Sequence, residues 1–231
     1  MPNPFRDRIW KKRESSLWSS FNEACQGGYF QKAKELIEAG ADINEKGDLR
    51  KTALMLASQY GRLNVVQFLI EAGADINVKN NRGETALILA SSNDRLNVVQ
   101  FLIEAGVDID ARDGRGDTAL MFASSNGELN VVQSLIEAGA GVNVRNGEGN
   151  TALIFASSKG KLDVVQSLIE AGADINVRNN EGETALMKAH RYSKANRGQH
   201  AEIEQLLINS GADQRGLDTV KLMTAIRPEP K

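Results

Sequence analysis

The chain has 231 residues, of which 41% are hydrophobic and 25% charged, and its formal net charge is -2. This composition suits a folded soluble protein, and the near-zero charge excludes bulk attraction to nucleic acid or to anionic membranes. No apolar run approaches the roughly 20 residues that cross a bilayer, and a single cysteine, Cys25, excludes an internal disulfide framework.

Residues 1–17 form an N-terminal segment with both apolar and basic side chains. Phe5, Ile9 and Trp10 are spaced for one side of a helix, which we expect to cap the folded part of the chain. The alternative is a basic tail, made by Arg6, Arg8, Lys11, Lys12 and Arg13. Because the segment lacks the apolar core of a secretory signal, we expect a cytoplasmic protein; export by a route without such a signal is the alternative.

Two short strings recur along the rest of the chain at a step of 33 residues. The string T-A-L begins at Thr52, Thr85, Thr118, Thr151 and Thr184. The string L-I-E-A-G ends at Gly40, Gly73, Gly106, Gly139 and Gly172. A unit of about 33 residues cannot bury an adequate core alone, so the period predicts similar units stacked on their neighbours. Six units are readable between residues 18 and 214.

The unit that follows Val78 shows how each repeat is expected to fold. Asn80 to Gly83 has turn chemistry, and the hydroxyl of Thr85 is placed to cap a short first helix. In most units this helix ends at a glycine suited to left-handed backbone: Gly28, Gly61, Gly127 and Gly160. A second helix follows, with an apolar stripe made by Val98, Val99, Leu102 and Ile103. Each unit is therefore a hairpin turn followed by two helices.

With these elements the sequence resembles the ankyrin repeat family. The resemblance rests on the Thr and Leu of the T-P-L-H-x-A signature, on the V-V-x-x-L-I helix and on the G-A-D-I-N exit. It covers about Trp18 to Gln214. It implies an all-α, ankyrin-type solenoid of about six helix-turn-helix repeats joined by hairpin loops. It also implies a protein–protein interaction scaffold or adaptor rather than an enzyme.

Some positions depart from the family pattern. The signature histidine is replaced by an apolar residue in five units: Met55, Ile88, Met121, Ile154 and Met187. We therefore expect apolar packing in place of the imidazole hydrogen bonds. Asp94 replaces the glycine that ends a first helix, which predicts about 1 kcal/mol of backbone strain. Arg50 stands where the first hairpin would take a glycine.

The sixth unit is six residues longer than the others, with the extra length around Arg191 to His200. Insertions in repeats map to loops and often carry binding. We favour the alternative, a solvated loop in a degenerate terminal unit that includes both His190 and His200. Beyond this unit, residues 215–231 are expected to form a capping helix and a loose tail. The apolar side of that helix would be made by Leu217, Val220, Leu222 and Met223.

No motif with catalytic chemistry occurs in the sequence. There is neither a phosphate-cradling G-x-x-x-x-G-K-[ST] nor a zinc-binding H-E-x-x-H. His190 and His200 have no cysteine or second ligand pair nearby, so a metal site has little support. A glutamate at the end of each second helix indicates a solvated face: Glu38, Glu71, Glu104, Glu137 and Glu170. We therefore expect no enzyme activity, no cofactor and no metal.

The resemblance places partners on a concave side that the hairpin tips and the outward side of the first helices form. One cation per unit precedes each tip, in a basic column made by Lys46, Lys79, Arg112, Arg145 and Arg178. Further candidates are Arg82 and Arg115 at the tips, with Tyr60, Asn93, Asn126, Lys159 and Tyr192 at the ends of first helices. At a spacing of about 10 Å the cations repel one another little. The basic column can therefore persist without a function, balanced by Glu84, Asp117 and Glu183.

We expect a monomer, without membrane insertion, that binds a protein partner through these residues. An acidic segment of that partner would suit the basic column, and tyrosines would serve as anchors. The alternative is a polyanion or nucleic-acid binder that uses the same column. Interleaved acids and few aromatic residues argue against it, and five phosphate contacts would give a log–log salt slope of about -4.5.

Overall fold

The computed structural model describes residues 19–193, 199–215 and 217. The predicted N-terminal capping segment, residues 1–17, lies outside this range, as do residues 194–198 of the predicted insertion. Of the predicted C-terminal capping helix and tail, only Arg215 and Leu217 are described. The described part contains helices and no strand, so the predicted all-α fold is confirmed. None of the helices in these ranges has the length and apolar character that crossing a bilayer requires.

Each repeat contributes a first helix and a second helix. In the first repeat, residues 19–27 are helical and are followed by α2 (Phe30–Glu38). A short 3-10 turn, η1 (Asp48–Arg50), lies in the first hairpin. The helix pairs that follow are α3 (Ala53–Gln59) and α4 (Leu63–Glu71), α5 (Ala86–Ser91) and α6 (Leu96–Glu104), α7 (Ala119–Asn126) and α8 (Leu129–Glu137), α9 (Ala152–Lys159) and α10 (Leu162–Glu170), and α11 (Ala185–Ser193) and α12 (His200–Asn209).

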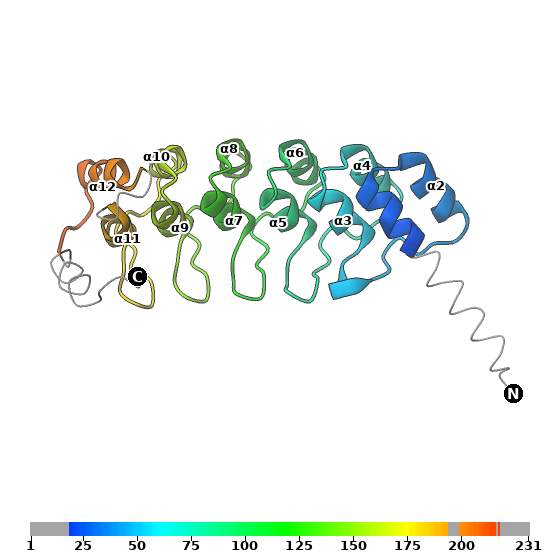
Figure 1. Ribbon diagram of the computed structural model, residues 1–231, viewed down its shortest axis with the longest axis horizontal. Coiled ribbons are helices and arrows are strands. Elements are labelled where there is room, and N and C mark those ends of the chain that lie inside the picture. Colours follow the sequence, from blue (N-terminus) through cyan, green and yellow to red (C-terminus); the bar gives the residue numbers. More distant parts are fainter. Residues whose placement is uncertain (1–18, 194–198, 216, 218–231) are drawn as a thin grey trace, which may run out of the picture. The chain divides into compact units, whose positions relative to one another are not determined.

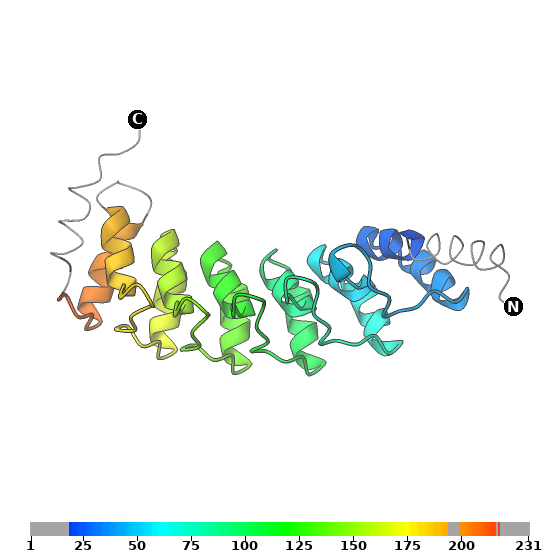
Figure 2. The ribbon, with the colours of Figure 1, turned by 90° about the horizontal axis from the view of Figure 1, so that it is seen from below.

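The chain divides into two units, Met1–Gly114 and Arg115–Lys231. In the first unit α3 packs against α5, and α4 packs against both α2 and α6. In the second unit α9 packs against α7 and α11, and α10 against α8 and α12. In each unit the first helices form one layer and the second helices another, with the hairpins extending from the layer of first helices (Figure 1). Figure 2 shows successive helix pairs of each unit side by side. The packing of neighbouring pairs covers their apolar faces.

The T-A-L threonine caps the first helix of the second to sixth repeats, as the sequence predicts. In α3, Oγ1 of Thr52 accepts a hydrogen bond from the N–H of Met55 at 3.4 Å. Thr85, Thr118, Thr151 and Thr184 make the same bond in α5, α7, α9 and α11. The bond satisfies a first-turn donor that has no partner within the helix. The glycines predicted to end first helices all have positive φ, between 69° and 87°: Gly28, Gly61, Gly127 and Gly160.

The apolar stripe of the second helices lies in the core of each unit. In α6, Val98, Val99 and Leu102 are buried and Ile103 is half-buried. Each such side chain stabilises the fold by about 1.5–3 kcal/mol when fully buried. The position of the family histidine is also buried, so the predicted apolar packing is confirmed at Met55, Ile88, Met121, Ile154 and Met187. The predicted solvated face is confirmed as well, since the helix-end glutamates are exposed: Glu38, Glu71, Glu104, Glu137 and Glu170.

A row of buried serines lies beside this core. Ser58, Ser91, Ser124 and Ser157 occupy the same position in α3, α5, α7 and α9, and each is 0% exposed. Within the described residues, none of the four hydroxyls has a hydrogen-bond partner. A buried hydroxyl without a partner costs about 1–3 kcal/mol. The row is therefore a weak point in otherwise apolar packing.

Asp94 has the left-handed backbone that the sequence predicts, with a φ of 55°. Because a side chain is strained in this conformation, we expect Asp94→Gly to raise the free energy of unfolding by about 1 kcal/mol. Urea denaturation followed by circular dichroism would show a higher midpoint at unchanged slope. Asp94→Asn is the control, and its gain should be smaller because asparagine tolerates left-handed backbone only in part. A lower midpoint for Asp94→Gly would contradict the prediction.

Candidate protein-interaction surface

Three of the hairpins are each built around a buried asparagine. In the second hairpin, Oδ1 of Asn80 accepts from the N–H of Arg82 at 2.8 Å and from that of Glu84 at 3.0 Å. The N–H of Asn80 in turn donates to the carbonyl of Glu84 at 3.0 Å. Asn146 and Asn179 make the same set of bonds in the fourth and fifth hairpins. These bonds fix each loop locally, because the asparagine amide replaces a missing backbone partner.

Adjacent hairpins are joined by backbone hydrogen bonds at their tips, which we call the tip bonds. In each bond the tip residue supplies the carbonyl, and the next hairpin supplies the N–H. The tip bonds of the first unit are Asn81 to Leu49 (3.0 Å) and Gly114 to Arg82 (2.7 Å); those of the second are Gly147 to Arg115 (2.9 Å) and Asn180 to Glu148 (2.9 Å). Because only backbone atoms take part, the tip bonds do not depend on which side chain stands at the tip.

Buried side chains add a second connection between hairpins of the second unit. Nδ2 of Asn146 donates to Oδ1 of Asp117 at 2.6 Å, and Nδ2 of Asn179 donates to Oδ1 of Asn150 at 2.9 Å. All four side chains are buried. Asp117, Asn150 and their equivalents are therefore part of the hairpin framework rather than of its exposed surface.

All five residues of the basic column are exposed, but several use their side-chain donors within the fold. Nζ of Lys79 donates to the carbonyl of Arg112 at 2.8 Å. Nη2 of Arg145 donates to the carbonyl of Arg178 at 2.9 Å. In each case the acceptor is the column residue one repeat further on. These cations therefore brace one hairpin against the next.

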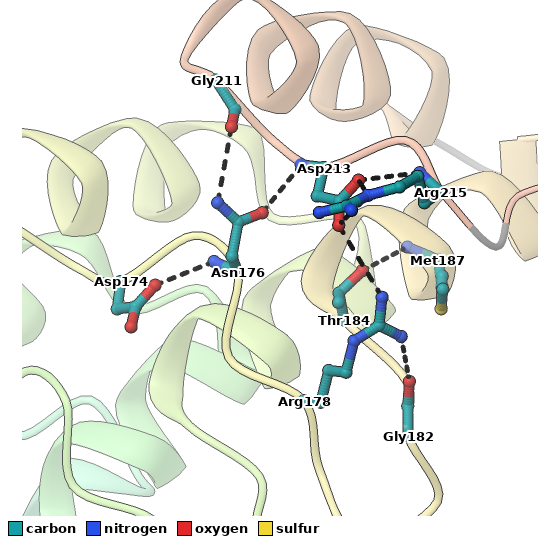
Figure 3. Close-up of polar contacts among 9 residues, drawn as sticks. All are labelled: Asp174, Asn176, Arg178, Gly182, Thr184, Met187, Gly211, Asp213 and Arg215. Carbon is teal, nitrogen blue, oxygen red and sulfur yellow. Dashed lines mark hydrogen bonds and ion pairs between the residues drawn. The ribbon is translucent and has the colours of Figure 1, made fainter.

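Arg178 is held in a similar way near the C-terminal end of the described residues (Figure 3). Its Nη1 donates to the carbonyl of Gly182 at 2.8 Å, and its Nη2 lies 4.0 Å from a carboxylate oxygen of Asp213. Asp213 also accepts from Arg215, whose guanidinium lowers the pKa of that carboxyl below its ordinary value. The last cation of the column is therefore engaged by its own chain.

The G-A-D-I-N exits link the repeats on a different loop (Figure 3). Oδ1 of Asn176 accepts from the N–H of Asp213 at 2.7 Å, and its Nδ2 donates to the carbonyl of Gly211 at 3.4 Å. The N–H of Asn176 donates to Oδ1 of Asp174 at 3.0 Å. The bond from an aspartate N–H to the preceding asparagine recurs for Asp75 and Asn44, Asp108 and Asn77, and Asp174 and Asn143. The repeated string is thus a structural link.

The predicted contact residues at the ends of the first helices differ in exposure. Tyr60 is 40% exposed, and Asn126 and Lys159 are also exposed. Asn93 is half-buried, and its Nδ2 donates to the carbonyl of Leu89 at 2.8 Å. Tyr192 is half-buried, with its ring centroid 5.4 Å from that of His200. Of these five residues, Tyr60, Asn126 and Lys159 are the most accessible to a partner.

The cations at the hairpin tips are exposed, whereas the acids beside them bind to groups of their own repeat. Arg82 and Arg115 are exposed at the tips, as predicted. Glu84 accepts from Nδ2 of Asn80, so it serves its own hairpin. Glu183 is buried and pairs with Lys188 and Arg191 of α11. The predicted balance between the column and these two acids is therefore replaced by local pairing.

Glu183 is the most strongly perturbed acid among these groups. Burial of its carboxylate by itself would raise its pKa, because the charged form loses contact with water. The hydrogen bond from Lys188 and the positive charges of Lys188 and Arg191 outweigh that effect and lower the pKa below its ordinary value. Glu183 is therefore a charged part of the sixth-repeat framework.

The structure adds an apolar row that the sequence analysis did not identify. Leu56, Leu89, Phe122 and Phe155 occupy one position of successive first helices, and all except Leu89 are half-buried rather than buried. The available signal was the change from leucine to phenylalanine at one position of successive first helices. We use the term hairpin face for the surface made in each unit by this row, the hairpin tips and the exposed ends of the first helices.

The two histidines are not part of a solvated loop, which corrects the interpretation favoured from the sequence. Nδ1 of His190 lies 2.6 Å from Oε1 of Glu204, and His190 is buried. His200 is also buried at the start of α12, with Nε2 3.2 Å from the carbonyl of Ser158. Arg62 and Arg95 make the equivalent bond in the second and third repeats, to the carbonyls of Gln26 and Gln59. His200 therefore occupies a position in the regular repeat, and the extra length precedes it.

Two further features of the described residues concern the metal-ligating side chains and the cysteine. No group of three or more His, Cys, Asp or Glu side chains in these ranges is placed to hold a metal ion. Cys25 is fully buried, and burial raises the pKa of its thiol to about 12. It therefore stays protonated at neutral pH, and a protonated thiol is a poor nucleophile.

Comparison with known protein families agrees with this architecture. A family model described as ankyrin repeats (3 copies) matches residues 21–113 and 120–218. A second, described as ankyrin repeats (many copies), matches residues 94–136. No curated protein gave a significant match to the chain. The first family model covers well over half of the sequence, and the chain belongs to the ankyrin repeat family.

Proposed function

We propose that the chain is a non-catalytic interaction module that binds a protein partner through its hairpin face. Ankyrin repeats are generally protein–protein interaction modules, and proteins built from them are typically non-catalytic scaffolds. The observation that carries the proposal is the separation of constant and variable positions. Threonine caps, asparagine turns and tip bonds build one framework, while exposed residues such as Tyr60, Asn126 and Lys159 differ between repeats.

The hairpin face has the physical properties of a binding surface. Its loops are fixed by internal hydrogen bonds, so little conformational entropy is lost when a partner docks. Phe122 and Phe155 offer apolar area on α7 and α9, which pack against each other. Asn126 and Lys159, at the ends of the same helices, offer polar contacts at its edge. An apolar centre with a polar rim is typical of protein–protein contacts.

Site-specific photo-crosslinking in cells that make the protein tests the proposal. A benzophenone amino acid placed at Asn126 or Lys159 should give discrete protein adducts. The matched control positions are Glu137 and Glu170, which are exposed at the ends of α8 and α10. Adducts of equal yield from both pairs of positions would contradict the proposal. Adducts that nuclease removes and protease does not would favour the nucleic-acid alternative instead.

A further inference from the structure

The first hairpin departs from the others at two adjacent positions. Leu49 stands at its tip, where the equivalent residues are charged: Arg82, Arg115, Glu148 and Glu181. Arg50 stands where the other hairpins have Gly83, Gly116, Gly149 and Gly182. Leu49 is 51% exposed, and both Leu49 and Arg50 have a φ of 57°. Two consecutive side-chain-bearing residues thus adopt left-handed backbone.

This conformation is unfavourable for the folded chain taken alone. Left-handed backbone brings the side chain of a residue such as leucine too close to the following carbonyl. An exposed leucine also forgoes the stabilisation that burial would provide. Strained backbone of this kind clusters at ligand-binding sites, where the surrounding structure holds it in place. The tip bond from Asn81 to the carbonyl of Leu49 is such a restraint.

The exposed charges on the hairpins of the first unit are mostly positive. The exposed charged residues there are five cations and one acid: Lys46, Arg50, Lys79, Arg82 and Arg112, with Asp48. On the hairpins of the second unit they are three cations and two acids: Arg115, Arg145 and Arg178, with Glu148 and Glu181. Within the described residues, the side chains of Lys46, Arg50 and Arg82 form no hydrogen bond or ion pair.

We propose that the hairpins of the first unit bind an acidic segment of a protein partner, with an apolar side chain of that segment against Leu49. Arg50 and Arg82 would pair with carboxylates on either side of the apolar contact, since a guanidinium matches a carboxylate in two-point geometry. A nucleic acid is disfavoured at the same place, because the negative charge of the exposed Asp48 would repel its continuous row of phosphates. The inference rests on the proposed function and specifies its partner by charge and by one apolar anchor.

Selection from a random peptide display library on the full chain tests this inference. Selected peptides should be rich in Asp and Glu and carry a large apolar residue. Leu49→Asn removes the apolar side chain but keeps a residue that tolerates positive φ, and Arg82→Glu reverses one unpaired tip charge. Each substitution should raise the Kd of the selected peptides at least about tenfold, which corresponds to a loss of about 1.4 kcal/mol of binding free energy. Binding should also weaken with added salt.

Exposed charges on the second helices of the same unit, outside the hairpin face, supply the controls. Lys34→Glu on α2 and Glu71→Asn on α4 should leave the Kd unchanged within about twofold. Peptides without acidic residues, or an equal loss in the control variants, would overturn the inference while leaving the proposed function intact. Salt-sensitive binding of a short DNA duplex that Arg82→Glu abolishes would also overturn it. Failure of the photo-crosslinking experiment, by contrast, would remove the proposed function itself.

Discussion

Gly83→Ala is expected to lower the free energy of unfolding by about 3 kcal/mol. Gly83 has a φ of 78°, and a Cβ atom there would lie 2.5 Å from the backbone nitrogen of Gly114. Alanine therefore meets two penalties, the left-handed backbone and a collision with the next hairpin that no side-chain rotation can relieve. Urea denaturation followed by circular dichroism measures the change as a lower midpoint.

Gly182→Ala is the matched control for this substitution. Gly182 has nearly the same φ, 76°, but a Cβ atom there would have no neighbour within 4 Å. Its loss should be about 1 kcal/mol, which is the backbone penalty alone. Equal losses at the two positions would show that the close approach of adjacent hairpins is not what requires glycine at position 83.

Replacing the buried serines by alanine should stabilise the protein. Each of Ser58, Ser91, Ser124 and Ser157 carries a fully buried hydroxyl without a partner among the described residues. Removing one such hydroxyl should raise the free energy of unfolding by about 1 kcal/mol. Alanine is in addition the better helix former. The four changes lie in separate helices, so together they should add about 4 kcal/mol, measured as a higher urea midpoint.

Ser92→Ala serves as the control for the serine series. Ser92 follows Ser91 in the chain, but its Oγ donates to the carbonyl of Leu89 at 3.2 Å. Its removal should therefore give no gain, or a loss of up to about 1 kcal/mol. A loss of stability in the variants of the buried row would indicate that those hydroxyls have partners in solution and would refute the interpretation.

The fold was predictable because its signals are local. A threonine before an apolar helix predicts the cap observed at Thr52, and a glycine after it predicts the left-handed end observed at Gly61. Asp94 in place of glycine likewise predicts the positive φ that the structure has. Each signal depends on a few neighbouring residues. The period of 33 residues then predicts the same local structure in each successive repeat.

The candidate surface was predictable only in part, because its details depend on contacts between repeats. The basic column can be recognised in the sequence. The groups that accept hydrogen bonds from it are backbone carbonyls, however, and the sequence does not indicate which carbonyls these are. The sequence predicts Lys79 and Arg145 as contacts for a partner, and the structure adds that each of these exposed side chains donates a hydrogen bond to the next repeat. The placement of His190 and His200 in a solvated loop was wrong because their partners lie on other helices: Glu204 on α12 of the same repeat, and the carbonyl of Ser158 on α9 of the preceding repeat.

The tip bonds have a consequence for how the sequence of such a protein can evolve. They join hairpins through N–H and C=O groups that every residue except proline supplies. Mutation can thus exchange leucine, arginine or glutamate at a tip without dismantling the array, as Leu49, Arg82 and Glu148 illustrate. Specificity can then diverge while the scaffold persists, and the same positions are natural choices for randomisation in engineered binders.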